Sequence, residues 1–172
     1  MGSVLAIDTG RDGAAVVVSP DLQILDYLML RNHLESAHLL AVLIEEYQPE
    51  RIVVERNASA PGQSVTGAWT HGMNYGIVLG VICGGGYEYV TIDPGTWHKI
   101  VPREEHEDEQ FLKWGTRLAK WYIWNSAARA NPGVFENLRE RKDQGLADAY
   151  WMAVADYRRN RPALFNPDSY DS

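Results

Sequence analysis

Residues 3 to 10 read S-V-L-A-I-D-T-G, an apolar run followed directly by an acid and two turn-forming residues. The run predicts a β-strand over Ser3–Ile7, and similar runs follow at Ala14–Ser19 and Gln23–Leu30. Turn-forming residues separate the three runs, with Gly13 in the first gap and Pro20 in the second. This pattern predicts a three-stranded antiparallel meander at the start of the chain.

Helical and strand patterns alternate after the meander. Apolar residues recur at helical spacing before a strand-like run that ends at Glu55, which indicates a parallel crossover. The order predicts an α/β fold with a five-stranded mixed sheet, in which a three-strand antiparallel meander is joined by two parallel strands and flanked by helices. The predicted elements after the meander are helices at His33–Tyr47, Ser64–Cys83, 94–99, 109–128 and 145–159, and strands at Arg51–Glu55 and Tyr87–Ile92.

Composition limits the class of protein. The 172 residues predict one domain over 1–161 and a flexible tail over 162–172, and a hydrophobic content of 45% is enough for a core. The single cysteine excludes an intramolecular disulfide and a cysteine zinc site. We expect a cytoplasmic protein, because the sequence contains neither a signal peptide nor a run of 18 apolar residues. A net charge of −7 argues against a nucleic-acid binder held by overall charge alone, unless bound cations neutralise clustered acids.

Two acids follow strands that are expected to lie side by side. Asp8 ends V-L-A-I-D and Glu55 ends I-V-V-E, so both should project from the edge where α/β sheets place their ligands. The last helix, which begins within K-D-Q-G-L-A-D-A, could bring Asp148 and Asp143 to the same place. Crowded carboxylates repel each other unless a cation lies between them, and oxygen ligands suit Mg²⁺ or Mn²⁺. Two such ions about 4 Å apart are the usual arrangement for phosphodiester hydrolysis.

Five motifs in order now suggest a family. The series A-I-D-T-G, I-V-V-E-R, G-M-N-Y-G-I-V-L-G, P-G-T-W-H-K and K-D-Q-G-L-A-D-A resembles the RuvC-like Holliday-junction resolvases, especially phage-encoded forms, of the ribonuclease H-like superfamily. The resemblance spans roughly residues 3 to 157. It implies a homodimeric endonuclease of a phage or bacterium that cleaves four-way DNA junctions with two Mg²⁺ or Mn²⁺ ions per site. It further implies that Asp8, Glu55 and Asp148 are catalytic metal ligands and that the last segment adds a fourth acid.

The sequence departs from the family pattern at two places. Relatives often carry an acid or histidine three residues before the last aspartate, where this chain has Gly145, and Asp143 is the natural substitute. Asp143 could equally be a helix cap. The segment 103–110 is acidic where relatives tend to be basic, so DNA contacts are expected from other residues. The candidates for DNA binding are Arg11, Arg56, Trp69, Lys99, Lys113 and Lys142.

A row of glycines marks the predicted helix over residues 64–83. Gly72, Gly76 and Gly80 recur every four residues, and glycine costs a helix about 1 kcal/mol relative to alanine. A close contact should compensate, either with the sheet or with a second copy of the chain, and we favour a homodimer through this helix. Trp69 is either a core residue or an exposed ring that stacks on DNA bases.

Two rival functions use the same fold. A non-catalytic protein that binds branched DNA is favoured by the acidic segment 103–110, while the acids at the other positions argue against it. An actin-like ATPase shares the fold and a D-x-G opening, but that class needs two such domains around a cleft, and 172 residues cannot supply both.

Overall fold

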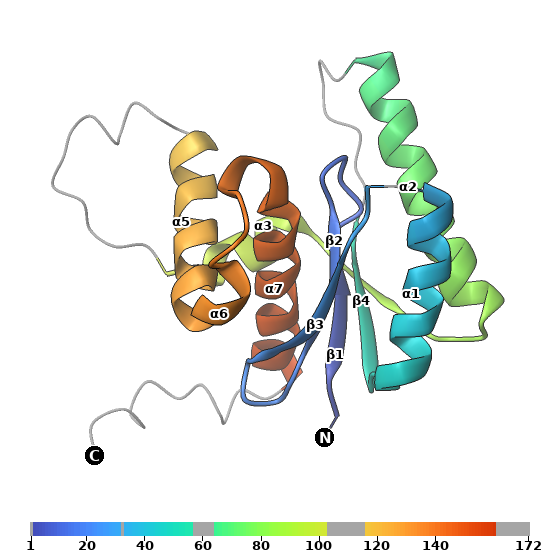
Figure 1. The fold of residues 1–172 in the computed structure, drawn as a ribbon, viewed down its shortest axis with the longest axis horizontal. Helices are drawn as coiled ribbons and strands as arrows, with labels where there is room; N and C mark the ends of the chain where they lie inside the picture. The colour runs from blue at the N-terminus through green and yellow to red at the C-terminus, as the bar shows by residue number, and fades with distance from the viewer. Residues whose placement is uncertain (1, 32, 57–63, 103–115, 161–172) are drawn as a thin grey trace, which may run out of the picture.

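The computed structural model describes residues 2–31, 33–56, 64–102 and 116–160. The strands are β1 (Val4–Ile7), β2 (Ala14–Val18), β3 (Ile24–Met29), β4 (Arg51–Glu55) and β5 (Val90–Ile92) (Figure 1). The helices are α1 (His33–Tyr47), α2 (Val65–Gly84), α3 (Pro94–Trp97), the 3-10 helix η1 (His98–Ile100), α5 (Thr116–Ala130), α6 (Pro132–Phe135) and α7 (Glu140–Asn160).

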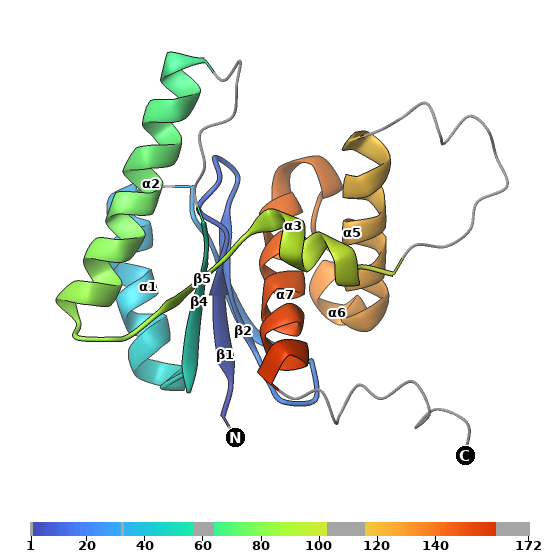
Figure 2. The ribbon, with the colours of Figure 1, turned by 180° about the vertical axis from the view of Figure 1, so that it is seen from behind.

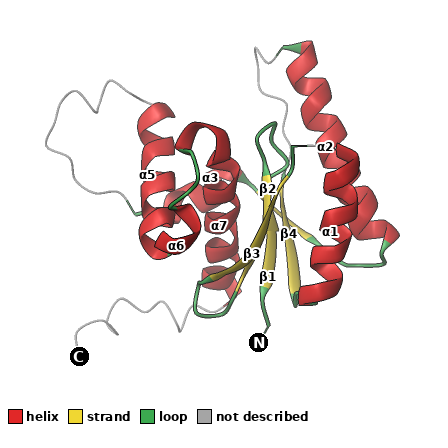
Figure 3. Cartoon of the chain, viewed as in Figure 1, coloured by secondary structure: helices red, strands yellow, loops and turns green. Residues whose placement is uncertain are grey.

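The strands form one mixed sheet in the order β3-β2-β1-β4-β5. Figure 3 shows this sheet between two layers of helices. The first three strands pair antiparallel, as a meander does. β4 pairs parallel with both β1 and β5. The predicted fold class is therefore confirmed, including the adjacency of the first and fourth strands.

Helices cover both faces of the sheet (Figures 1 and 2). α1 and α2 lie on one face, while α7 lies against the other and is itself covered by α5 and α6. Side chains alternate between the two cores along β1: Leu5 and Ile7 join the α1–α2 core, and Val4 and Ala6 join the α7 core. The same alternation sends the residue after β1 toward α7, which is important for the site.

The structure differs from the sequence prediction most clearly at three places. β5 begins at Val90 and not at Tyr87, because the preceding residues close α2: Gly86 has φ +75°, and the backbone N of Tyr87 donates to Ile82 O at 3.0 Å. The Asn131-Pro-Gly segment opens the short helix α6, since proline is tolerated in the first turn of a helix. α7 begins at Glu140, five residues earlier than predicted. The predicted start of the preceding helix, the acidic segment 103–110 and the predicted tail lie outside the described residues.

The glycine row faces outward. At Gly72, Gly76 and Gly80 an added Cβ would meet no described heavy atom outside α2 itself within 4 Å, so these glycines do not serve close packing on the sheet. Trp69 is 72% exposed, so the core interpretation of this residue is wrong. Cys83 is also exposed. One side of α2 is therefore a surface of small residues with a tryptophan near its beginning.

Among the described helices, none combines the length and apolar character needed to cross a membrane.

Candidate active site

Asp8 lies directly after the central strand and is 7% exposed. Side chains alternate along a strand, so Asp8 points to the same face of the sheet as Val4 and Ala6, which is the α7 side. Its backbone N donates to Ala14 O at 2.9 Å, so Asp8 is still aligned with β2. One carboxylate oxygen accepts a hydrogen bond of 2.8 Å from the backbone N of Gly10. The strand and its turn together hold the carboxylate in one place.

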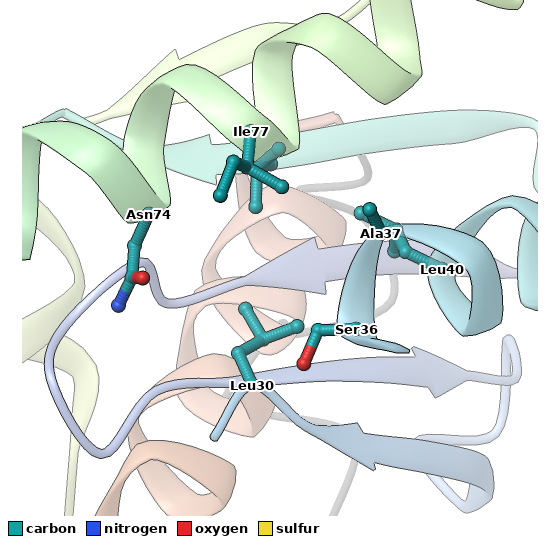
Figure 4. A pocket seen from close by; sticks show the side chains of 7 residues that line it. Leu30, Ser36, Ala37, Leu40, Asn74 and Ile77 are labelled. Carbon is teal, nitrogen blue, oxygen red and sulfur yellow. The ribbon is translucent and has the colours of Figure 1, made fainter. Parts of the chain in front are cut away.

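The β1–β2 loop is tied to α2 from the other side. Asn74, which is 4% exposed, donates its side-chain amide to Gly10 O at 3.0 Å. Figure 4 shows Asn74 beside this loop, at one end of a small cavity between α1, α2 and Leu30. The cavity has a free volume of about 10 Å³, which holds one water molecule at most. It is therefore part of the support of the site and not a ligand pocket.

Glu55 ends β4, and its side chain points to the same face of the sheet as that of Val53, which joins the α7 core. The indole N–H of Trp97 donates to Glu55 Oε1 at 3.0 Å and fixes its orientation. Burial, followed by the negative charge of Asp8, raises the pKa of Glu55 to about 8. Burial raises the pKa of Asp8, and a side-chain hydrogen bond that it shares with Glu55 acts in the opposite direction. The two acids are therefore close enough to act on a common ligand.

Asp148 reaches the same place from α7. Burial and the charge of Asp8 raise the pKa of Asp148 to about 7, while Gln144 and Lys120 act in the opposite direction. Gln144, one turn earlier on the helix, donates its amide to Asp148 Oδ1 at 3.0 Å. The charge of Asp148 also raises the pKa of Glu55. The structure thus brings together the three acids, which come from β1, β4 and α7.

Asp143 is not brought to this group. α7 is kinked at Asp143, with φ −118° and ψ 15°. Its carboxylate pairs with Arg31 and accepts a hydrogen bond of 2.6 Å from the backbone N of Arg139. Of the two roles that the sequence left open, neither appears in the described contacts of Asp143: its carboxylate bonds back to the residue before α7, whereas an N-cap accepts from the backbone two or three residues further on. A role as a metal ligand would require Asp143 to leave Arg31.

Gly145 brings α7 into close contact with the β1–β2 loop. A Cβ added to Gly145 would lie 2.7 Å from Gly13 Cα and 2.9 Å from Asp8 Oδ2, and it would collide with the backbone O of Asp12. α7 therefore touches the β1–β2 loop at Gly145. The close approach brings the helix backbone to Asp8 and leaves no room for a ligand at residue 145.

The donor set suits a hard divalent cation. Burial is the largest cause of the raised pKa at each of the three acids, and the charge of Asp8 raises the pKa of the other two. A cation among them would remove this repulsion, and carboxylate oxygens are the preferred ligands of Mg²⁺ and Mn²⁺. As they stand, no three His, Cys, Asp or Glu side chains of the described residues form a ready metal cage. The acids would have to rotate toward a shared ion.

The predicted DNA-binding residues that the structure describes lie on the surface. Arg11 has 80% of its side chain exposed and pairs with Asp12 at 3.1 Å. Arg56 pairs with Asp93 at 3.3 Å. Trp69, Lys99 and Lys142 are exposed, and Lys113 lies outside the described residues.

Several residues around the acids were not assigned to the site from the sequence. His71 of α2 and Lys120 of α5 both lower the pKa of Asp8 through their positive charges. Trp97 and Gln144 orient acids through hydrogen bonds. Only the spacing of Gln144, one helical turn before Asp148, was a usable signal in the sequence.

Comparison with known proteins supports the fold. No family model and no curated protein matches the chain. Thermus thermophilus RuvC in complex with a Holliday junction substrate aligns with a TM-score of 0.55 and 14% identity, over 92% of this chain and 95% of that one. A second Thermus thermophilus RuvC structure gives 0.53 and 14%, over 93% and 96%. The yeast mitochondrial Holliday junction resolvase Ydc2 gives 0.48 and 13%, over 94% and 83%. From the two Thermus thermophilus structures, the chain has the RuvC-type, ribonuclease H-like fold over nearly all of its length.

Proposed function

We propose that this chain is a divalent-metal-dependent endonuclease that cleaves branched DNA, with four-way (Holliday) junctions as its main substrate. The observation that carries the proposal is the convergence of Asp8, Glu55 and Asp148 at the carboxyl edge of a RuvC-type sheet. Three carboxylates that repel one another and are removed in part or in full from solvent have no evident structural use, because their repulsion destabilises the fold. A solved RuvC of the same fold is bound to a Holliday junction. Such a protein would work in the cytoplasm of a bacterium or an infected bacterium.

The residues of the site would have different roles in the reaction. Asp8, Glu55 and Asp148 would hold two Mg²⁺ or Mn²⁺ ions. When bound, such ions lower the pKa of the attacking water and stabilise the charge on the leaving oxygen. Trp97 and Gln144 keep two of the acids in orientation through their hydrogen bonds. Asp143 remains a proposed fourth ligand, on condition that it exchanges Arg31 for a cation.

A homodimer through α2 is part of the proposal. The outward glycine row lets a second helix approach closely, and Trp69 stands near the beginning of the same helix. Two-fold symmetry would present two sites to the two symmetric strands of a four-way junction. Arg11, Arg56, Lys99 and Lys142, together with Lys113, would contribute phosphate contacts around these sites, and Trp69 would stack on bases.

The decisive experiment compares two substitutions in one loop. Asp8→Asn should lower nicking of a synthetic four-way junction with Mg²⁺ by at least about 10³-fold, equivalent to about 4 kcal/mol of barrier. Asp12→Asn, the control, removes an acid from the same loop that lies outside the acid group and should keep activity within about threefold. Forks, flaps, three-way branches and linear duplexes, each tested with Mg²⁺ and with Mn²⁺, define substrate and metal preference.

The outcomes separate the rival functions. Cleavage that survives Asp8→Asn contradicts the assignment of the site. A wild-type protein that binds junctions but cleaves no DNA with either metal would instead be a non-catalytic branched-DNA binder.

A further inference from the structure

A second hollow lies at the same edge of the sheet, beside β3. It has a volume of about 310 Å³. Tyr27 and Met29 of β3 pack against the α7 core. Because side chains alternate between the two faces of a strand, Arg31, two residues after Met29, starts on the same α7 side. The other side of the hollow comes from the segment that joins α6 to α7 and from the start of α7. The residues on which the argument rests are Tyr27, Arg31, Asn137, Arg139, Lys142 and Asp143.

Sheet register places this hollow close to the acid group. Asp8 bonds to Ala14, and Ala14 is paired with Met29, so the three residues lie in one row across β1, β2 and β3. Two strand spacings separate the ends of this row, or about 10 Å. Arg31 follows Met29 by two residues. The hollow is therefore the next feature along the sheet edge from Asp8.

The hollow is positive although the protein is not. Arg31, Arg139 and Lys142 carry three positive charges against the one negative charge of Asp143, whereas the whole chain has a net charge of −7. Asp143 is buried and holds Arg31 on one side, yet the Arg31 side chain stays 52% exposed. The same guanidinium also donates to Lys142 O at 3.3 Å. Arg31 is thus oriented by its contacts and still open toward the hollow.

We propose that this hollow binds a backbone phosphate of the DNA strand that enters the acid group. Guanidinium groups recognise phosphate oxygens through paired hydrogen bonds, and Lys142 adds a mobile positive charge. Successive phosphates of one strand rise about 3.4 Å along the axis of a duplex and lie further apart than this through space. A backbone separation of about 10 Å therefore places the hollow within a few nucleotides of the bond held at the acids. The inference rests on the proposed function only in that the phosphate belongs to DNA.

As long as Asp143 stays paired with Arg31 it is a positioning residue and not a metal ligand, because it orients Arg31 toward the phosphate and joins that contact to the start of α7. Exchange of Arg31 for a cation would end this contact. Asp148 lies five residues further along the same helix. Strand binding and the acid group are then connected through one rigid element.

The test uses Arg139→Gln together with Lys142→Gln. Arg31 is left in place, because its loss would leave Asp143 buried without its cation. Junction binding is measured by fluorescence anisotropy in EDTA at several salt concentrations. The double variant should bind about tenfold more weakly, and the slope of log K against log salt should fall by about one. Arg141→Gln with Arg159→Gln removes the same charge from exposed positions outside the hollow and should change affinity by less than about twofold.

A neutral methylphosphonate scanned along the junction strand locates the contact. One position should weaken binding to the wild type and have no further effect on the double variant. If no position behaves in this way, or if both double variants lose the same affinity, the proposal is wrong. If one position behaves in this way but the wild type cleaves no DNA with metal, the phosphate site is upheld and the nuclease proposal is wrong. If the wild type cleaves DNA but no position behaves in this way, the nuclease proposal stands and the phosphate site is wrong.

Discussion

Asp8, Glu55 and Asp148 hold more negative charge than the surrounding protein can stabilise alone. Trp97, Gln144 and the charges of His71 and Lys120 offset part of the burial. The pKa of Glu55 nevertheless remains raised to about 8. A residue that is costly to ionise in the folded state and unusually well oriented is typical of a functional site.

Stability should therefore depend on pH through Glu55. The folded state holds the Glu55 proton up to about pH 8, whereas the unfolded state releases it near 4.5, so stability is lost as pH rises through this window. Without divalent metal, Glu55→Gln should be more stable than the wild type at pH 8 by about 2–4 kcal/mol, with little difference at pH 4. Urea unfolding at both pH values measures this. If the difference in unfolding free energy between Glu55→Gln and the wild type is the same at pH 8 and at pH 4, the acids do not repel each other as proposed.

Gly145 should not tolerate a side chain. Gly145→Ala places a methyl group against Gly13 Cα and Asp8 Oδ2, and the expected loss is about 2–3 kcal/mol. Gly133→Ala is the control, because an added Cβ there meets no described heavy atom outside α6 itself within 4 Å. Thermal unfolding of both variants is the measurement. Equal stabilities would mean that the helix can shift away from the loop.

At the scale of elements, α7 is held to the sheet by an ion pair near each of its ends. Its start reaches Arg31 through Asp143, and its end reaches β4 through Asp156. Arg51 donates to the two carboxylate oxygens of Asp156 at 2.8 and 3.0 Å. Asp148 sits between these two anchors, so the helix cannot slide without moving an acid of the site.

Removing the far anchor should loosen the helix. Asp156→Ala leaves Arg51 partly buried without its partner and should destabilise the fold by about 3 kcal/mol. Arg51→Ala should cost a similar amount, and the double variant should cost less than the sum of the two. A double-mutant cycle from denaturant unfolding gives the coupling directly. Additive losses would show that this ion pair contributes no coupling to the fold.

For the whole molecule, the exposed side of α2 and the net charge of −7 both bear on assembly with DNA. Overall charge repels nucleic acid, so binding has to be local and sensitive to salt. A dimer would double the number of local contacts without changing either subunit.

The dimer can be tested at the centre of the glycine row. Gly76→Glu places a charge where a second helix would approach and should shift the protein from dimer to monomer, as measured by sedimentation velocity. Ala130→Glu adds the same charge at an exposed position of α5 and should leave the dimer intact. A wild-type protein that is monomeric at every concentration tested would contradict the α2 interface.

The local sequence pattern alone was enough to predict the sheet and the edge at which its acids lie. The alternation along β1 and β4 and the adjacency of these strands put Asp8 and Glu55 at one edge, because strand parity and parallel pairing are regular. The existence of the last helix, with Asp148 on it, followed from apolar spacing in the same way.

Only the tertiary structure decided the surroundings of the acids. The partner of Asp143 is Arg31, which lies 112 residues away in the chain, and no spacing rule selects it. The role of Gly145 depends on the β1–β2 loop, and the exposure of Trp69 depends on which side of α2 meets the sheet. Burial and long-range contacts arise from how elements pack, and a single sequence records the elements far better than their packing.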